Sequence, residues 1–267
     1  MERRIHTDRL HAGEIELPAA EAHHVRDVLR LVPGSVVEIF DDEGSVGRGV
    51  LTVCGSAGVV VRVNEIQDAP NVPRWVVASA VPKGERADWL VEKISELGAS
   101  AFTPLITARS VVLPEGRGKR DRWLRLATES AKQSRRSGVM KIHELTPLGK
   151  AIESALEAWP VNLPPRAREQ RRPIHPPAVG WYLSTEENAR PIHEVVFDPM
   201  TFSSLTLFVG PEGGWTPTET KAFDEAGFTP VALTDTVLRI ETACVAAATI
   251  ASAMLMPRLM RATNNVG

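Results

Sequence analysis

The segment Gly210-Pro211-Glu212-Gly213-Gly214 is the most informative candidate site in the sequence, because it lies between an apolar run and a helix start. Glycines let a ligand approach the main chain closely, and the first turn of a helix offers free N–H groups. The spacing matches neither G-x-G-x-x-G nor a P-loop, which argues against a dinucleotide-binding protein or a nucleoside triphosphatase. We therefore expect a ligand-binding turn, and the motif alone leaves open a purely structural strand-to-helix turn.

A second polar turn follows about twenty residues later, in LTDTVLRIETACVAA. Arg239 and Glu241 stand there at the start of an otherwise apolar helix, and they are either functional or a simple ion pair. Thr234 and Asp235 can satisfy helix-start donors. Ligands of open α/β sheets bind beyond the carboxyl ends of neighbouring strands, so the two turns are expected to form one site.

The elements that position these turns alternate between strand and helix from residue 75 onward, which predicts a mostly parallel sheet covered by helices. The expected strands are 75–81, 100–107, 179–184, 204–210 and 228–234. The expected helices are 86–98, 120–136, 216–227 and the Ala-rich 241–256. The Pro- and Arg-rich stretch 164–177 follows neither period and is expected to be a loop, either a solvated insertion or an arm that touches RNA.

Residues 1–70 have a different pattern, with β-rich runs at 35–40, 46–54 and 59–66 separated by turn residues. A helix with apolar residues at helical spacing precedes them and is expected to end at Pro33-Gly34. The segment 68–75 contains two prolines and no periodicity, so it is the expected boundary. We expect a small β-barrel-type domain over 1–70 and a second domain over 75–267.

Charge is concentrated in the middle of the chain although the net charge is only -2. Residues 117–141 hold 9 Lys and Arg against Asp121 and Glu129, a local charge of +7. Such a segment either contacts nucleic-acid phosphates or forms a solvated helix face.

Composition narrows the class of protein. With 43% hydrophobic and 24% charged residues, the chain is an ordinary globular protein rather than a fibrous or disordered one. No apolar window approaches the ~18 residues of a membrane span, and the amino terminus lacks the apolar core of a secretory signal, so we expect a cytoplasmic protein. Cys54 and Cys244 lack metal-ligand spacing, and neither a disulfide framework nor a metal is implied.

Taken together, the segments FVGPEGGWTPTE and LTDTVLRIETACVAA resemble the two cofactor-loop motifs of the RsmE family, 16S ribosomal RNA uridine-N3 methyltransferases of the SPOUT class. HHVRDVLRLVPG, KGERADWLVEKISELGASAFTPLITARSVV and ATESAKQSRR agree with that resemblance. It implies a PUA-like RNA-binding domain followed by an α/β SPOUT methyltransferase domain with a C-terminal trefoil knot, which binds S-adenosyl-L-methionine and acts as a homodimer on 16S ribosomal RNA or the small ribosomal subunit.

The resemblance also assigns residues by position. The cofactor-binding set is Leu183, Ser184, Gly210, Pro211, Glu212, Gly213, Leu233, Thr236, Val237 and Leu238. Arg239 and Glu241 match charged positions beside the transfer site and are the expected catalytic residues. The RNA-binding set is Arg109, Gln133, Ser134, Arg135 and Arg136. The sequence departs from the common family pattern at Thr234 and Thr236.

Methylation of uridine N3 requires loss of the imino proton, and no histidine lies in the matched loops to accept it. Positioning, together with a cation that stabilises the uridine anion, is therefore expected to supply the rate. Two alternatives remain: a related enzyme that methylates another base or a ribose 2′-OH, and a non-catalytic RNA-binding assembly factor.

Overall fold

The computed structural model describes residues 3–56, 58–67, 74–114, 116–157, 179–195 and 204–255. The expected loop 164–177 and residues 68–73 of the expected boundary lie outside these ranges. Contacts divide the chain into two units, one comprising residues 1–71 and 125–140 and the other residues 72–124 and 141–267. The sequence pattern places residues 125–140 in the second domain, whereas the contacts group this segment with the first unit.

The first unit contains a five-stranded sheet in the order β1-β3-β4-β5-β2. The strands are β1 (Arg3–His6), β2 (Gly13–Glu16), β3 (Val36–Phe40), β4 (Val46–Gly55) and β5 (Gly58–Gln67). β1 pairs with β3 in parallel, and the other pairs are antiparallel. Alternate side chains of these strands, such as Ile39, Leu51 and Val61, are buried in one apolar core.

The helix of the first unit is shorter than expected. It consists of α1 (Ala19–His23) and a π-helical turn, η1 (His24–Val28). Val25 is buried, whereas Val28 and Val32 are 60% and 64% exposed. Arg30 adopts a positive φ of 52°, which ends the helical path before Pro33. The helical spacing was correct around Val25, but its extension to Pro33-Gly34 was wrong.

The second unit contains an eight-stranded sheet in which seven strands follow the order β11-β13-β10-β12-β6-β7-β8, and β9 pairs with β7. All of its strand pairs are parallel. The strands are β6 (Arg74–Ser79), β7 (Ala101–Ile106), β8 (Lys141–Ile142), β9 (Thr146–Pro147), β10 (Val179–Leu183), β11 (Arg190–Pro191), β12 (Ser204–Val209) and β13 (Thr229–Ala232). The expected parallel α/β sheet is thus observed, and the trefoil knot stays a prediction.

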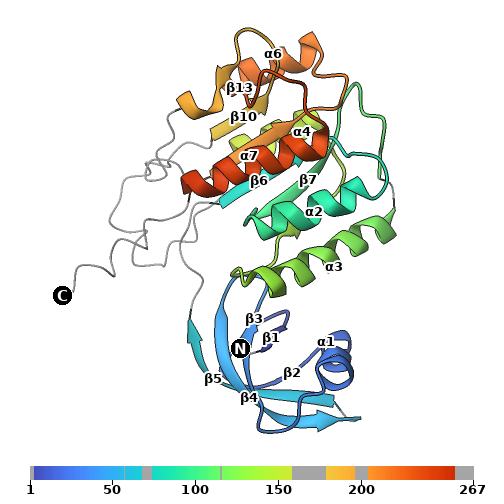
Figure 1. Cartoon of the computed structure of the whole chain (residues 1–267), viewed down its shortest axis with the longest axis vertical. Helices are drawn as coiled ribbons and strands as arrows, with labels where there is room; N and C mark the ends of the chain where they lie inside the picture. The colour runs from blue at the N-terminus through green and yellow to red at the C-terminus, as the bar shows by residue number, and fades with distance from the viewer. Residues whose placement is uncertain are drawn as a thin grey trace, which may run out of the picture. The chain divides into compact units, whose positions relative to one another are not determined.

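Helices cover both faces of this sheet (Figure 1). The helices of this unit are α2 (Arg86–Glu96), α4 (Leu148–Leu156), α6 (Pro217–Glu225) and α7 (Ile240–Leu255), with a short 3₁₀ turn η2 (Ile192–Glu194). Helix α3 (Arg117–Ser134) begins in this unit. α4 and α6 pack on one face around Tyr182, Phe208 and Phe223. α7 packs on β6 and β12 and against α2, and the Cys244 thiol donates a hydrogen bond to Ser79 Oγ at 3.2 Å.

Helix α3 is shared between the two units, with residues 117–124 in the second and 125–134 in the first. In the second unit, Trp123 packs edge-on against Phe102, with ring centroids 5.5 Å apart. Asp88 of α2 holds the same half of the helix: Lys119 Nζ and Trp123 Nε1 donate to its Oδ1 at 2.7 and 2.8 Å. None of the helices in the described ranges has the length and apolar content that a membrane crossing needs.

Candidate functional site

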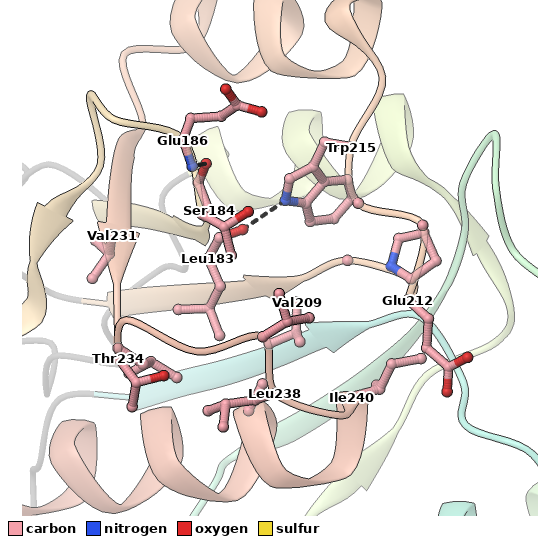
Figure 2. Close-up of a pocket in the computed structure, with 18 of the residues that line it drawn as sticks. Leu183, Ser184, Glu186, Val209, Glu212, Trp215, Val231, Thr234, Leu238 and Ile240 are labelled. Carbon is pink, nitrogen blue, oxygen red and sulfur yellow. Dashed lines mark hydrogen bonds between the residues drawn. The ribbon is translucent and has the colours of Figure 1, made fainter.

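A cavity of about 300 Å³ lies where β10, β12 and β13 end, and three loops enclose it (Figure 2). One loop follows Leu183, one runs from Gly210 to Trp215, and one connects β13 to α7. The carboxyl ends of parallel strands meet at the same edge of a sheet, so loops far apart in the sequence converge there. This volume falls in the range of small-molecule sites.

All ten residues assigned to the cofactor from the sequence line this cavity. Arg109, assigned to RNA, lines it as well. The lining also includes residues that the sequence reasoning missed: Thr185, Glu186, Val209, Gly214, Trp215, Thr220, Val231, Thr234, Ile240 and Ala243. Most of these are chain neighbours of assigned residues, so extending each motif by one or two positions would have found them.

Trp215 fixes the glycine loop. Its indole Nε1 donates to the Leu183 carbonyl oxygen at 2.8 Å, which ties the loop to the end of β10. A side chain on Gly210 would place Cβ 2.9 Å from the Trp215 ring, so glycine is needed for this packing. Gly214 has a φ of +70°, a conformation that other residues rarely adopt. Packing thus sets the conformation of the loop that lines the cavity.

Glu219 connects the start of α6 to the loop after β7. It forms a capping box with Thr216, in which Glu219 Oε2 accepts from Thr216 N at 2.8 Å and Thr216 Oγ1 accepts from Glu219 N at 3.3 Å. Its other oxygen, Oε1, accepts from Ala108 N at 2.8 Å. One buried carboxylate therefore holds two of the loops near the cavity in register.

The last loop leads from the cavity to the two residues assigned to catalysis. Leu238 and Ile240 line the cavity, whereas Arg239 between them does not. Arg239 is exposed, and its guanidinium has no hydrogen bond or ion pair to any of the described residues. Among the described residues, Arg239 is thus an unpaired cation between two residues that line the cavity.

Glu241 is buried, and its Oε1 accepts from Arg86 Nη1 at 3.1 Å. The alternative prediction that Arg239 and Glu241 simply form an ion pair with each other is wrong, because Glu241 pairs with Arg86 of α2 instead. Glu241 does not line the cavity, and within the described residues its Oε2 has no hydrogen-bond partner.

The chain matches the family model described as an RNA methyltransferase domain over residues 70–252, and an RNA methyltransferase PUA domain over residues 17–63. A relative from Mycobacterium bovis named ribosomal RNA small subunit methyltransferase E is 32% identical, and the match covers 85% of this chain and 81% of the relative. The chain belongs to the RsmE family. A relative of the same name from Synechocystis is 31% identical, with 90% of this chain and 73% of the relative covered.

The fold is that of other RsmE proteins. The crystal structure of a ribosomal RNA small subunit methyltransferase E from Neisseria gonorrhoeae, bound to S-adenosyl methionine, superposes with a TM-score of 0.75. The sequences are 24% identical, and the match covers 95% of this chain and 98% of the other. A PUA-like domain followed by a SPOUT methyltransferase fold is thus the architecture of this RsmE-family chain.

Arg109 has a contact in this RsmE-family cavity that charge alone did not predict. Its Nη1 donates to the Gly213 carbonyl oxygen at 2.5 Å, although the side chain is exposed. A side chain on Gly213 would bring Cβ to 3.2 Å from Arg109 Cδ. Arg109 therefore holds the glycine loop from the solvent side, whether or not it also contacts RNA.

The other four RNA-binding candidates lie together in the first unit, and none lines the cavity. Gln133, Ser134 and Arg135 are exposed, and Arg135 has a φ of +56°. Arg136 is half-buried; burial, with the nearby charge of Arg4, lowers its pKa to about 10, so it is charged at neutral pH. The structure thus groups the predicted site residues into a cavity set and a first-unit set.

The cavity fits a small nucleoside-containing cofactor by its chemistry. Apolar side chains such as Val209, Val231 and Leu238 provide walls for a flat base, and the glycine loop from Gly210 to Gly213 brings main-chain atoms to the cavity wall. Binding through main-chain groups explains why the matched loops contain few side chains that look catalytic.

Proposed function

We propose that this protein transfers a methyl group from S-adenosyl-L-methionine to N3 of a specific uridine in 16S ribosomal RNA. The observation that carries the proposal is the convergence of three family-matched loops on one cavity at the strand ends. The relatives from Mycobacterium bovis and Synechocystis are named ribosomal RNA small subunit methyltransferase E, and the Neisseria structure contains S-adenosyl methionine.

Residues of the three loops would hold the cofactor, with Leu183 and Ser184 on one side and the segments 210–213 and 233–238 around it. The bound cofactor supplies an activated methyl group on a sulfonium sulfur. The chain itself must hold the cofactor, admit one base edge and exclude water. Apolar walls together with fixed main-chain donors and acceptors suit that task.

Arg239 is the residue proposed to act on the reacting base. The N3 proton passes to the solvent, which leaves negative charge on the uridine ring and its carbonyl oxygens. A guanidinium can donate hydrogen bonds to those oxygens. Its charge is permanent, so Arg239 stabilises the anion and does not accept the proton. Glu241 enters the proposal as a positioning residue, since its pair with Arg86 fixes the start of α7 next to Ile240 of the cavity.

The substrate base must be unpaired or flipped, because N3 lies on the Watson–Crick edge. The RNA-binding set of Arg109, Gln133, Ser134, Arg135 and Arg136 would contact the strand around it. The substrate is 16S ribosomal RNA, free or within the small subunit, and we place the reaction in the cytoplasm without a metal.

A homodimer, which the resemblance implies, is also part of the proposal. The Ala-rich helix needs no partner chain to explain its composition, because α7 buries Ala247, Ala248 and Ala251 within its own unit. The resemblance to RsmE proteins is what supports the homodimer.

Nucleoside mass spectrometry of methylation products tests the proposed reaction. The protein is incubated with S-adenosyl-L-methionine and either naked 16S ribosomal RNA or small subunits that lack the modification, with Arg239→Ala as the matched control. We expect 3-methyluridine with the unaltered protein and a strongly reduced amount with the variant. A 2′-O-methyl nucleoside or another methylated base as the product would contradict the proposed reaction and indicate a related methyltransferase. Absence of cofactor binding in calorimetry would favour an RNA-binding assembly factor without catalytic activity.

A further inference from the structure

Segment 133–137 comprises the last two residues of α3 and the three residues that follow it. Contacts on either side of the segment, at Lys132 and at Gly138-Val139, hold it within the first unit. At its start, Lys132 Nζ pairs with Glu21 Oε2 at 2.5 Å, and both side chains are about one-tenth exposed, at 11% and 9%. The other oxygen of Glu21 accepts from His6 N at 3.2 Å. One buried carboxylate of α1 therefore holds the end of α3 and β1 together.

The end of the segment rests on the turn between β3 and β4. Val139 N donates to the Asp42 carbonyl oxygen at 3.3 Å. Gly138 has a φ of +77°, and a side chain there would place Cβ 3.0 Å from the same Asp42 oxygen and 3.2 Å from Gly44 Cα. The two backbones thus touch at a position that only glycine permits.

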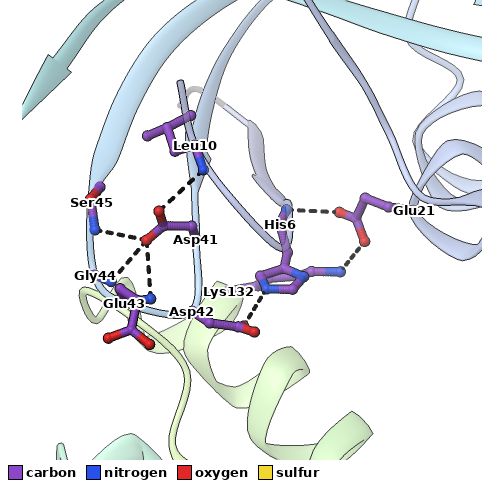
Figure 3. Close-up of polar contacts among 9 residues, drawn as sticks. All are labelled: His6, Leu10, Glu21, Asp41, Asp42, Glu43, Gly44, Ser45 and Lys132. Carbon is purple, nitrogen blue, oxygen red and sulfur yellow. Dashed lines mark hydrogen bonds and ion pairs between the residues drawn. The ribbon is translucent and has the colours of Figure 1, made fainter. Parts of the chain in front are cut away.

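Asp41 sets the shape of that turn. Its Oδ1 accepts from the main-chain nitrogens of Glu43, Gly44 and Ser45 at 3.1, 2.9 and 2.9 Å, and its Oδ2 accepts from Leu10 N at 3.1 Å (Figure 3). His6 Nε2 lies 2.8 Å from Oδ1 of the neighbouring Asp42. Four hydrogen bonds to one buried carboxylate make the turn a fixed support for Gly138 and Val139.

We propose that Glu21 and Asp41 are positioning residues for the substrate RNA, which hold segment 133–137 as a preformed loop that binds the RNA backbone. The inference rests on the proposed function, since it takes Arg135 and Arg136 as RNA contacts. Glu21 and Asp41 would then favour RNA binding although they are acidic. They hold segment 133–137 in one conformation before RNA binds, which lowers the conformational-entropy cost of binding.

The sign of the charge change makes this inference testable. Glu21→Gln removes a negative charge, which by electrostatics alone strengthens RNA binding. If Glu21 positions the segment, the opposite is expected. The Kd for 16S ribosomal RNA and the KM for RNA should rise about tenfold, which corresponds to the loss of one charge-assisted contact. The kcat and the cofactor affinity should stay unchanged. Glu14→Gln is the matched control, because it removes the same charge from an exposed pair with Arg62 in the same unit.

Gly138→Ala provides an independent test at the other end of the segment, in case Glu21→Gln does not fold. We expect it to raise the KM for RNA in the same way, because the added Cβ pushes the segment off Asp42. Asp41→Asn, measured alongside, should do likewise. Thermal unfolding, recorded for each variant, establishes the temperature at which every protein assayed is fully folded.

The outcomes separate this inference from the function it rests on. If Arg135→Ala with Arg136→Ala leaves RNA affinity unchanged, the loop does not bind RNA, and the assignment of these residues fails. If that double variant weakens binding while folded Glu21→Gln and Gly138→Ala bind RNA as the unaltered protein does, positioning by Glu21 and Asp41 is overturned. Tighter binding by Glu21→Gln would also overturn it, since charge alone would then explain the result.

Discussion

The cofactor cavity and the basic segment 117–141 differ in what builds them. Main-chain groups and apolar side chains form the cavity, and glycine fixes its key loop. The basic segment is built of charged side chains, several of which have acidic partners far away in the sequence. Lys119 and Arg122 both pair with Asp88, and Lys132 pairs with Glu21.

This difference decides how far a sequence pattern can be trusted. Glycine and turn motifs specify backbone conformation locally, so a motif predicts its own geometry. A charge is free only if no partner folds against it, and sequence counting cannot reveal a partner 111 residues away, as for Lys132 and Glu21. The local charge of +7 therefore overstated the surface available to RNA.

The largest effect is expected for Arg239→Ala. Loss of one donor to a developing anion typically costs about 10²–10³ in turnover. The side chain is exposed and has no ion pair among the described residues, so the melting temperature should stay near that of the unaltered protein. Single-turnover methylation and thermal unfolding measured together check this, and a large stability loss with normal turnover would contradict it.

Gly213→Val should weaken cofactor binding roughly tenfold, as expected when one polar contact in a fixed loop is lost. The new side chain meets Arg109, which must leave the Gly213 carbonyl oxygen that it now holds. Calorimetry with S-adenosyl-L-methionine gives the affinity. Gly149→Val is the control, because a Cβ there meets nothing within 4 Å; equal affinities for the two variants would show that the glycine loop does not hold the cofactor.

Replacing Arg135 and Arg136 together by alanine should weaken RNA binding several-fold and reduce the slope of log affinity against log salt by about 1.4, or 0.7 for each lost single-strand phosphate contact. Cofactor affinity should not change, because neither residue lines the cavity. Filter binding at several salt concentrations measures the slope. An unaltered slope would show that Arg135 and Arg136 make no contacts with RNA phosphates and belong to a solvated surface.

Asp88→Asn should lower the free energy of unfolding by about 2 kcal/mol and leave cofactor affinity nearly unchanged. Burial alone would raise the pKa of Asp88, but hydrogen bonds from Lys119 and Trp123 and the charges of Lys119 and Arg122 outweigh it and hold the pKa below its usual value. The charged form therefore adds stability above about pH 4, and this stability is lost as the pH falls through the lowered pKa.

The variant should accordingly show a smaller loss of stability on acidification than the unaltered protein. Denaturant unfolding at a series of pH values measures it. Glu96→Gln, which breaks a more exposed pair with Lys93, serves as control and should change little. Identical acid-side curves for Asp88→Asn and the unaltered protein would contradict the role assigned to this carboxylate.

Much of the second unit was predictable, because its buried parallel strands are long apolar runs such as 204–209, in which five of six residues are buried. The two-residue strands β8, β9 and β11, and the helix α4, were missed. Strands so short carry no period, and their pairing depends on neighbours supplied by the sheet.

The parts of the site formed by contiguous residues were predictable from the sequence, and the contacts between residues far apart in the sequence were not. Ten lining residues came from the matched loops, whereas the tie from Trp215 to Leu183 and the bond from Arg109 to Gly213 join segments 32 and 104 residues apart. The pair of Glu241 with Arg86 spans 155 residues. No local pattern encodes such partners.

The different environments of the two cysteines have a practical consequence for labelling. Burial raises the pKa of the Cys244 thiol to about 12, and no part of that side chain is exposed, so it reacts with neither maleimides nor mild oxidants in the folded protein. Cys54 on β4 is only partly buried. A single fluorophore can therefore be attached in the PUA-like unit of the natural sequence, and its anisotropy would report RNA binding without any engineered cysteine.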